Sequence, residues 1–329
     1  EGSGSAVEGP VTVYASLPLT GPRAEAGRPV ADGARLALAH ADGRAGGVEV
    51  ELEVRDDAHG MLWSPAAVGA NARAAAQDSG AAAYIGELDS EPTRTSLPIT
   101  NDAEIVQVSP GAGGVDLTAP AQGYPDSPER YRPSGAVTFA RVVAADDEVA
   151  RAAAELAIDD GIRRVTVPDA RGPYERLVVG EFEAEAAAVG LEVVAAGQAD
   201  AALRIEADGG LTLVPRRAGV RELAVSPHLL PQAPGASDLA AVPTDDARSA
   251  PYAAAGYAAM QLVLQAIAEA AGDEGEDEFR LRVRDAVLGA QRTDSPLGSY
   301  SIDENGDADL CVQPYVNGEA RESPLCPDG

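Results

Sequence analysis

The chain has 329 residues, 45% of them hydrophobic, and a formal net charge of −28 at pH 7. This length allows two domains with cores of their own. All 25 basic residues are arginines, which excludes chemistry that needs a lysine, such as a Walker A phosphate site or a Schiff base. The acidic charge argues against nucleic-acid binding, because phosphates would be repelled. No apolar run reaches the roughly 20 residues that span a bilayer.

Strand-like and helix-like segments alternate along the first part of the chain. Residues 11–16 predict a strand, and a loop rich in Pro and Gly then leads to a helix that opens near Arg28. Residues 48–57 alternate apolar and acidic side chains, which predicts a strand with one solvated face. The next expected elements are a helix at 65–78 and strands at 81–87 and 105–110. This alternation predicts a parallel sheet with helices on both faces.

The alternation begins again after a Pro-, Gly- and Tyr-rich linker at 119–135. Only residues 197–200 separate one expected strand, 191–196, from the next at 201–206, whereas parallel neighbours need a crossover of about a dozen residues. Either these two strands are antiparallel or this part has lost a helix. A further apolar helix is expected at 251–271. The other expected elements here are helices at 149–158 and 173–189 and a strand at 163–169.

The C-terminal segment predicts small antiparallel ribbons. Asn305-Gly306 and Asn317-Gly318 are dipeptides typical of tight hairpin turns. Cys311 and Cys326 could form a disulfide, whose loop would stabilise the fold by roughly 3 kcal/mol. The alternative is two unrelated thiols.

Two local motifs suggest ligand chemistry but lack the residues that it needs. The glycine-rich stretch 109–118 has neither the G-x-G-x-x-G spacing nor the lysine of a nucleotide site. The stretch 303–307 resembles the start of a calcium loop, but Pro314 occupies its twelfth position, which favours a hairpin turn.

Asp56, Asp57 and His59 follow a predicted strand and could ligate a metal. Their spacing is more typical of a solvated strand end, because no H-x-x-x-H or C-x-x-C pattern accompanies them. We therefore expect neither a metal nor another cofactor.

An enzymatic function would need a nucleophile with an activating base. His228 with Ser90 or Tyr174 is the only such combination that the sequence suggests, and no G-x-S-x-G motif occurs. We expect that the protein is not an enzyme.

Several stretches, in order, resemble one known family. LPLTGPRAEAGRPVADGARLAL is similar to that family's opening loop and first helix, and YIGELDSEPT and VQVSPGAGGVDLT are similar to its two pocket loops. RGPYERLVVGEFEAEAAAVGLEVV resembles its tyrosine-headed helix, and PYAAAGYAAMQLVLQAI the helix with which the chain returns to the first lobe. The family is the branched-chain-amino-acid (Leu/Ile/Val-binding) type of periplasmic solute-binding protein of ABC transporters. The resemblance extends from about Val11 to Glu322.

The resemblance implies a two-lobed α/β fold of the type I periplasmic-binding-protein class. Each lobe would be a parallel sheet with flanking helices. The second lobe would be shortened, because the family's helix between 196 and 201 and a second helical segment before residue 251 are missing. The expected division is a flexible leader at 1–10, an N-terminal lobe at 11–136 plus 249–294, and a reduced C-terminal lobe at 137–248 plus 295–329.

In that family a small ligand is held between the lobes. Carried over by position, Ser90 takes the place of a pocket hydroxyl that binds a ligand carboxylate, and Leu88 and Asp89 lie beside it. Gly111 would supply a backbone carbonyl, next to Ala112.

Further positions complete the implied ligand site. Gly113 stands where amino-acid binders have a threonine, so one hydroxyl is missing. Tyr174 matches a pocket tyrosine of the second lobe, and His228 falls where those proteins place an acidic residue for the ammonium group. Glu25 and Ala26 would lie where the opening loop meets the ligand.

The acidic residues Glu25, Glu87 and Asp89 near this site have two interpretations. They could favour a ligand with a positive group, or they could be solvated loop acids in a chain that is rich in them.

The resemblance implies a monomeric, extracytoplasmic protein, which is secreted, lipid-anchored or periplasmic after removal of a signal peptide. It would capture an amino acid or a related small polar compound and deliver it to the membrane permease of an ABC importer. Two alternatives stay open: a ligand-sensing ectodomain of a signalling receptor on the same fold, and a degenerate domain that no longer serves transport.

Overall fold

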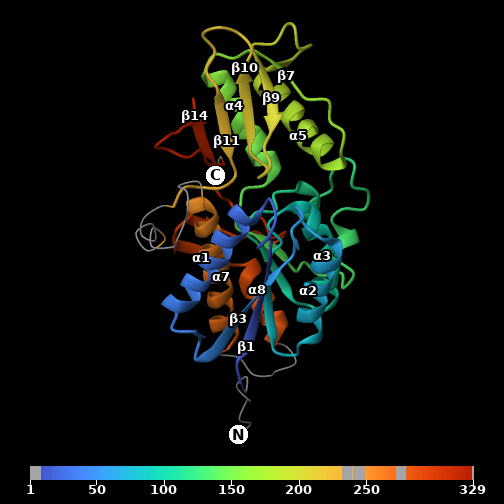
Figure 1. Cartoon of the computed structure of the whole chain (residues 1–329), viewed down its shortest axis with the longest axis vertical. Helices are drawn as coiled ribbons and strands as arrows, with labels where there is room; N and C mark the ends of the chain where they lie inside the picture. The colour runs from blue at the N-terminus through green and yellow to red at the C-terminus, as the bar shows by residue number, and fades with distance from the viewer. Residues whose placement is uncertain (1–8, 232–238, 240–248, 272–278, 328–329) are drawn as a thin grey trace. The chain divides into compact units, whose positions relative to one another are not determined.

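The computed structural model describes residues 9–231, 239, 249–271 and 279–327, and it divides into two compact units (Figure 1). The first unit comprises Glu1–Ala112, Pro128–Val143 and Leu230–Asp309, and the second comprises Gly113–Ser127, Ala144–Leu229 and Leu310–Gly329. Relative to the expected division, residues 113–127 belong to the second unit, and 137–143, 230–248 and 295–309 belong to the first. Among the described helices, none is both long and apolar enough to cross a membrane.

The first unit is built on a six-stranded sheet. Its strands are β1 (Val11–Leu17), β2 (Arg44–Ala45), β3 (Val48–Asp56), β4 (Ala81–Ile85), β5 (Val106–Ser109) and β6 (Phe139–Arg141). They lie in the order β2-β3-β1-β4-β5-β6, and all neighbours are parallel except the short edge strand β2. β4 and β5 are buried along their whole length, as is usual for central parallel strands.

Helices cover both faces of this sheet, as predicted (Figure 1). They are α1 (Ala24–His40), α2 (Pro65–Gln77), α3 (Ser90–Asp102), α7 (Ala250–Ala270) and α8 (Phe279–Leu288). The chain moves in one direction across the sheet from β1 to β3, and in the other from β3 to β4 and β5. Right-handed crossovers therefore place α1 on one face and α2 and α3 on the other. Accordingly, α1 packs against α7, and α2 packs against α3.

α1 begins earlier than the sequence predicted. A start near Arg28 was expected because the preceding stretch, rich in Pro and Gly, indicated a loop. The helix instead starts at Ala24, which places Pro29 inside it. Glu25 and Ala26 therefore belong to the helix and not to the opening loop. The Arg28 guanidinium in the helix donates to the Leu19 carbonyl in the opening loop at 2.8 Å and so connects the helix with that loop.

The second unit contains a seven-stranded sheet in the order β15-β14-β11-β10-β9-β7-β8. Its strands are β7 (Arg164–Thr166), β8 (Glu192–Val193), β9 (Ala201–Ile205), β10 (Leu211–Pro215), β11 (Leu223–Ser226), β14 (Gln313–Val316) and β15 (Glu319–Ala320). The helices α4 (Asp146–Asp159) and α5 (Pro173–Val189) pack on each other, and their apolar residues share one core with the sheet. α5 has the predicted bounds and ends at Gly190, whose φ of 77° is left-handed.

The pairing of β8 and β9 with β7 explains why no crossover helix follows residue 196. Of the two alternatives, the antiparallel pairing of these strands is wrong: both pair in parallel with β7, on its two sides, and no helix lies between them. β8 has two residues and ends at the level of Val165, where β9 also begins. Because β9 begins at the level where β8 ends, the chain does not need to return along the length of a strand. A short loop can therefore connect them. From β9 onward the sheet is antiparallel. The second helix expected to be missing, before residue 251, falls mostly outside the described residues.

The tail forms the predicted ribbons. β12 (Gln291–Ser295) pairs with β13 (Gly298–Ser301), and β14 pairs with β15 through a turn at Asn317 and Gly318, both with positive φ. Asn305-Gly306 also lies in a tight turn, which is closed by hydrogen bonds between Asp303 and Asp307 and between Gly306 and Asp303.

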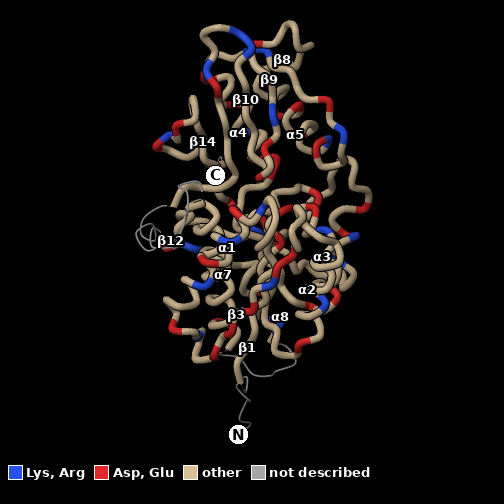
Figure 2. The backbone as a smooth tube through the Cα atoms, in the orientation of Figure 1, with Lys and Arg blue, Asp and Glu red and all other residues tan. Residues whose placement is uncertain are grey.

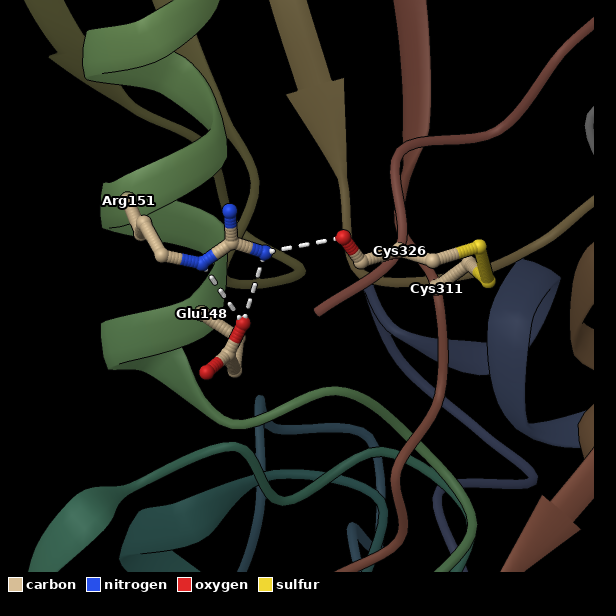
Figure 3. Close-up of a disulfide and its surroundings, with 4 residues drawn as sticks. All are labelled: Glu148, Arg151, Cys311 and Cys326. Carbon is tan, nitrogen blue, oxygen red and sulfur yellow. Dashed lines mark hydrogen bonds and ion pairs between the residues drawn. A yellow bond between two sulfur atoms is a disulfide. The ribbon is translucent and has the colours of Figure 1, made fainter. Parts of the chain in front are cut away.

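A disulfide joins Cys311 to Cys326 in the second unit (Figure 3). The Arg151 side chain of α4 donates to the Cys326 carbonyl at 3.3 Å and is held by Glu148 (Figure 3). The disulfide thus closes a loop within the C-terminal segment, and Arg151 attaches the end of this segment to α4.

Two glycines allow the close crossing of α1 and α7. A Cβ atom at Gly33 would overlap the Ala253 carbonyl, and one at Gly256 would overlap the Val30 carbonyl. We expect Gly256→Ala to lower the free energy of unfolding by about 1–3 kcal/mol, because overpacking outweighs the better helix propensity of alanine. Gly180→Ala in α5 is the matched control, since its Cβ would meet nothing closer than 3.5 Å. Equal effects in a denaturant titration would contradict this account.

The disulfide should stabilise the second unit by restricting the unfolded chain. For its sequence separation of 15, reduction is expected to cost about 3 kcal/mol. Urea unfolding with and without a reducing agent measures this difference. A Cys311→Ser/Cys326→Ser double variant should match the reduced protein and be insensitive to the reducing agent. A variant as stable as the oxidised protein would show that the bond contributes nothing.

Candidate functional site

Polar side chains gather at the carboxyl-terminal edge of the six-stranded sheet. β1, β3, β4 and β5 are parallel, so the loops that follow them leave from the same edge. The chain runs from β1 to β3 on one side and then returns to β4 on the other side of β1. In parallel α/β sheets, ligands bind outside the carboxyl ends of the strands at such a change of direction. We call the segments 16–23, 56–60, 86–90 and 109–112 the strand-end loops.

The loop after β4 carries three residues that the sequence predicted for ligand binding. Leu88 is buried, Asp89 immediately precedes α3, and Ser90 is the first residue of that helix. Asp89 forms a bidentate ion pair with Arg23, with Oδ1–Nη2 at 2.5 Å and Oδ2–Nε at 3.1 Å. The charge of Asp89 is therefore compensated within the first unit. Ser90 lies at a helix N-terminus, where backbone N–H groups and the helix dipole favour a negatively charged partner.

Hydrogen bonds and an ion pair fix the loop after β5. The Ser109 hydroxyl donates to the Glu87 carbonyl at 2.7 Å and accepts from the Ala112 amide at 2.8 Å. Arg141, which is fully buried, donates to the Ala112 carbonyl at 3.0 Å and to Asp307 Oδ1 at 2.6 Å. Gly111 and Ala112, both predicted for the site, therefore lie on a backbone that is tied to β4 and β6.

Asp56 organises the loop after β1. Its carboxylate accepts from the Thr20 hydroxyl at 2.6 Å and from the backbone amides of Leu19, Ala58 and His59. Burial opposes ionisation of this carboxyl, but the hydrogen bonds outweigh it and hold the pKa of Asp56 below its usual value. The side chain thus acts as a structural anchor. The described residues include no group of three or more His, Cys, Asp or Glu that could hold a metal.

Two buried carboxyl groups, Asp57 and Glu87, meet at the same edge. They are 1% and 0% exposed, their side chains face each other, and Tyr84 Oη donates to Glu87 Oε1 at 2.6 Å. Asp57 Oδ1 and Glu87 Oε2 are buried and accept no hydrogen bond from another described residue. Burial raises the pKa of both carboxyls, and the charge of Glu87 raises that of Asp57 further. The expectation of solvated acids is therefore wrong for Asp57 and Glu87. It holds for Glu25, which is exposed in the first turn of α1, whereas Ala26 is buried.

In the second unit, the predicted residues Gly113 and Tyr174 lie near Asp146. A Cβ atom at Gly209 would lie 3.3 Å from Asp146 Oδ1, 3.4 Å from Tyr174 Oη and 4.0 Å from the Pro227 ring. A Cβ atom at Gly113 would overlap the same Asp146 oxygen, so a threonine there would displace this side chain. His228 is buried and follows Pro227, and its amide donates to Ser226 Oγ at 3.2 Å.

The chain matches the family model described as periplasmic binding protein over residues 10–203. It belongs to the periplasmic binding protein family. Its two α/β units agree with that assignment, as do the sheets with flanking helices. No curated protein sequence matches the chain.

Solved structures of low sequence identity share the whole fold. A leucine-binding protein from Thermotoga maritima is 22% identical with a TM-score of 0.72, covering 97% of this chain and 99% of its own. A solute-binding protein from Rhodopseudomonas palustris HaA2, in complex with p-hydroxybenzoic acid, is 16% identical with a TM-score of 0.72 and 96% coverage of both chains. A substrate-binding protein from Desulfitobacterium hafniense in complex with Leu is 18% identical with a TM-score of 0.66, covering 96% and 100%.

The sequence reasoning missed several residues that shape the strand-end loops of the first unit and the surroundings of Asp146 in the second unit. Asp146 reads in the sequence as one of three acids in the first turn of a helix, a common capping pattern. Gly209 reads as an ordinary hairpin glycine. Arg141 and Asp307 lie far apart in the chain, so nothing in the sequence marks them as partners.

Across both units, acidic residues and arginines are interspersed along the backbone (Figure 2).

The Arg141–Asp307 ion pair should be a main support of the 109–112 loop. We expect Asp307→Ala to lower the free energy of unfolding by about 1.5–3 kcal/mol. The substitution removes a hydrogen bond between charged groups and leaves the buried Arg141 guanidinium without this ion pair. Asp285→Ala is the control: its side chain is 65% exposed and pairs with Arg284 at the surface. Chemical denaturation compares the two. A loss for Asp307→Ala no larger than that of the control would contradict the role given to this pair.

Proposed function

We propose that the protein binds a small carboxylate-bearing compound, an amino acid or an aromatic acid, and delivers it to an ABC importer outside the cytoplasm. Membership of the periplasmic binding protein family is the observation that carries this proposal. Similar structures are described as complexes with Leu, p-hydroxybenzoic acid and benzoate, and all three compounds have a carboxyl group. The protein would act as a monomer with a membrane permease as its partner.

The strand-end loops of the first unit suit a carboxylate. Ser90 combines a hydroxyl with the N-terminus of the 13-residue helix α3. The neighbouring acids do not oppose a negative ligand as strongly as their number suggests, because Asp89 is paired with Arg23 and Glu87 is fully buried with Tyr84 as a donor. In the second unit, Tyr174 Oη and the Asp146 carboxylate offer further polar atoms.

A ligand that binds only the folded protein raises its melting temperature. We expect L-leucine, p-hydroxybenzoate or benzoate to do so, and Ser90→Ala and Tyr174→Phe to weaken the affinity about tenfold or more, as for the loss of a hydrogen bond to a charged group. Isothermal titration calorimetry measures the affinities. Tyr315→Phe in β14 controls for a tyrosine change in the second unit. If no carboxylate stabilises the folded protein, the ligand class is wrong.

The import role requires a separate test. Cells with and without the gene should differ in uptake of whichever compound binds. Equal uptake would favour a binding protein that serves another purpose.

A further inference from the structure

We propose that Asp57 and Glu87 are positioning residues, and that the one proton they share holds segment 86–90 in its ligand-binding arrangement. Alkaline pH would then loosen this segment and weaken ligand binding. The inference rests on the proposed function for its link to the ligand, whereas the shared proton and its effect on the segment stand on the geometry of the first unit.

The pair connects three strands at the edge where the candidate site lies. Asp57 follows β3, Glu87 follows β4, and β1 runs between these two strands. Ser16 at the end of β1 also lies beside Glu87, and its hydroxyl accepts from Asn71 Nδ2 at 3.0 Å. The side-chain contact between Asp57 and Glu87 therefore spans the end of β1 and fastens the loops on its two sides to each other.

Asp57 is the fixed partner of the pair. Its amide donates to the Leu17 carbonyl at 3.0 Å, and its carbonyl accepts from the Ser64 amide at 2.8 Å. Glu87 lies in the segment that leads to Leu88, Asp89 and Ser90. Displacement of the Glu87 side chain would therefore move the part of the chain that carries the predicted ligand-binding residues.

The contact between the two side chains requires a proton. A carboxylate can only accept a hydrogen bond, so two carboxyl groups hydrogen-bond to each other only when one of them is protonated. Without that proton, two buried negative charges would face each other, which is strongly unfavourable.

Among the described residues, no cation is paired with Asp57 or Glu87. The charged groups that act most strongly on Asp57 are the acids Glu87, Asp89 and Asp56, and Asp89 already holds Arg23. The other groups that act most strongly on Glu87, which are Tyr84, Ser16 and Ser96, are neutral.

Loss of the proton would be transmitted to both pocket loops. The Glu87 carbonyl accepts from Ser109 Oγ, which also holds the Ala112 amide. The Gly86 amide donates to the Val108 carbonyl at 2.9 Å, and the Gly86 carbonyl accepts from Gln107 Nε2 at 2.9 Å. Repulsion that displaces Glu87 therefore strains the hydrogen bonds of segment 86–90 and those of loop 109–112 together.

The Asp57→Asn variant tests the proposal, because an asparagine amide donates to the Glu87 carboxylate without a proton that can be lost. The measurement is hydrogen exchange of peptides covering residues 86–93 between pH 6 and pH 9.5, corrected for the intrinsic rates. We expect the wild-type segment to lose protection tenfold or more over this range, and the variant to keep its protection. Asp285→Asn makes the same charge change at an exposed site and should behave like the wild type.

If Asp57→Asn does not fold, Glu87→Gln serves the same purpose, since the glutamine amide can donate to Asp57. Identical pH profiles for the wild type and the folded variant would overturn the proposal.

The link to ligand binding is measured with L-leucine or p-hydroxybenzoate, whichever binds. The dissociation constant should rise with pH for the wild type and stay level for Asp57→Asn. A wild-type affinity that is independent of pH, together with the expected exchange, would overturn the positioning role. If neither probe binds, the proposed ligand class fails, and the exchange profiles still decide whether the proton holds the segment.

Discussion

Irregular loops buried at a sheet edge must find hydrogen-bond partners for their backbone groups, and this constraint explains the polar residues of the first unit. Such groups cost free energy when they are left unpaired, and strand-end loops have no ladder to satisfy them. Here side chains take that place: Gln107 binds the Gly86 carbonyl, Ser109 binds the Glu87 carbonyl, and Arg141 binds the Ala112 carbonyl. The loops that would contact a ligand are therefore held rigid before any ligand arrives, which reduces the entropy lost on binding.

The second unit solves a different problem, which is to complete a sheet with few helices. Its parallel part consists of β8, β7 and β9 alone, and the sheet then continues through antiparallel strands that need only short turns. The last strands come from the C-terminal tail. The Cys311–Cys326 disulfide closes a loop within that tail, and Arg151 attaches its end to α4. A covalent link in this tail is useful because it restricts the unfolded chain.

The sequence predicted the fold well because its signals are local. Period-2 strands, glycine-ended helices and Asn-Gly turns are determined by neighbouring residues, and α5 and the turn at Asn317 and Gly318 were found where they were expected. The start of α1 was misplaced because a stretch rich in Pro and Gly favours a loop without requiring one. The pairing of β8 and β9 could not be decided from the sequence because adjacency in a sheet depends on the whole unit and not on the length of the connecting loop.

The candidate site was only partly predictable for the same reason. Leu88, Asp89 and Ser90 could be placed at a strand end, but the ion pair of Asp89 with Arg23 joins residues from different loops. The burial of Asp57 and Glu87 could not be read from the sequence either. In a chain with 53 acidic residues, nothing local distinguishes a buried acid from a solvated one.

The exclusive use of arginine suits the way this fold employs its cations. Arg280 of α8 donates to the carbonyls of Asp78, Ala81 and Ala103, and Arg141 holds a carbonyl and a carboxylate at once. A guanidinium has five donors in a fixed plane and can bind several acceptors from separate loops, whereas an ammonium is a compact charge on a flexible stem. Each of these arginines therefore joins segments that are distant in the sequence. A lysine at position 141 or 280 would keep the charge and would lose that geometry.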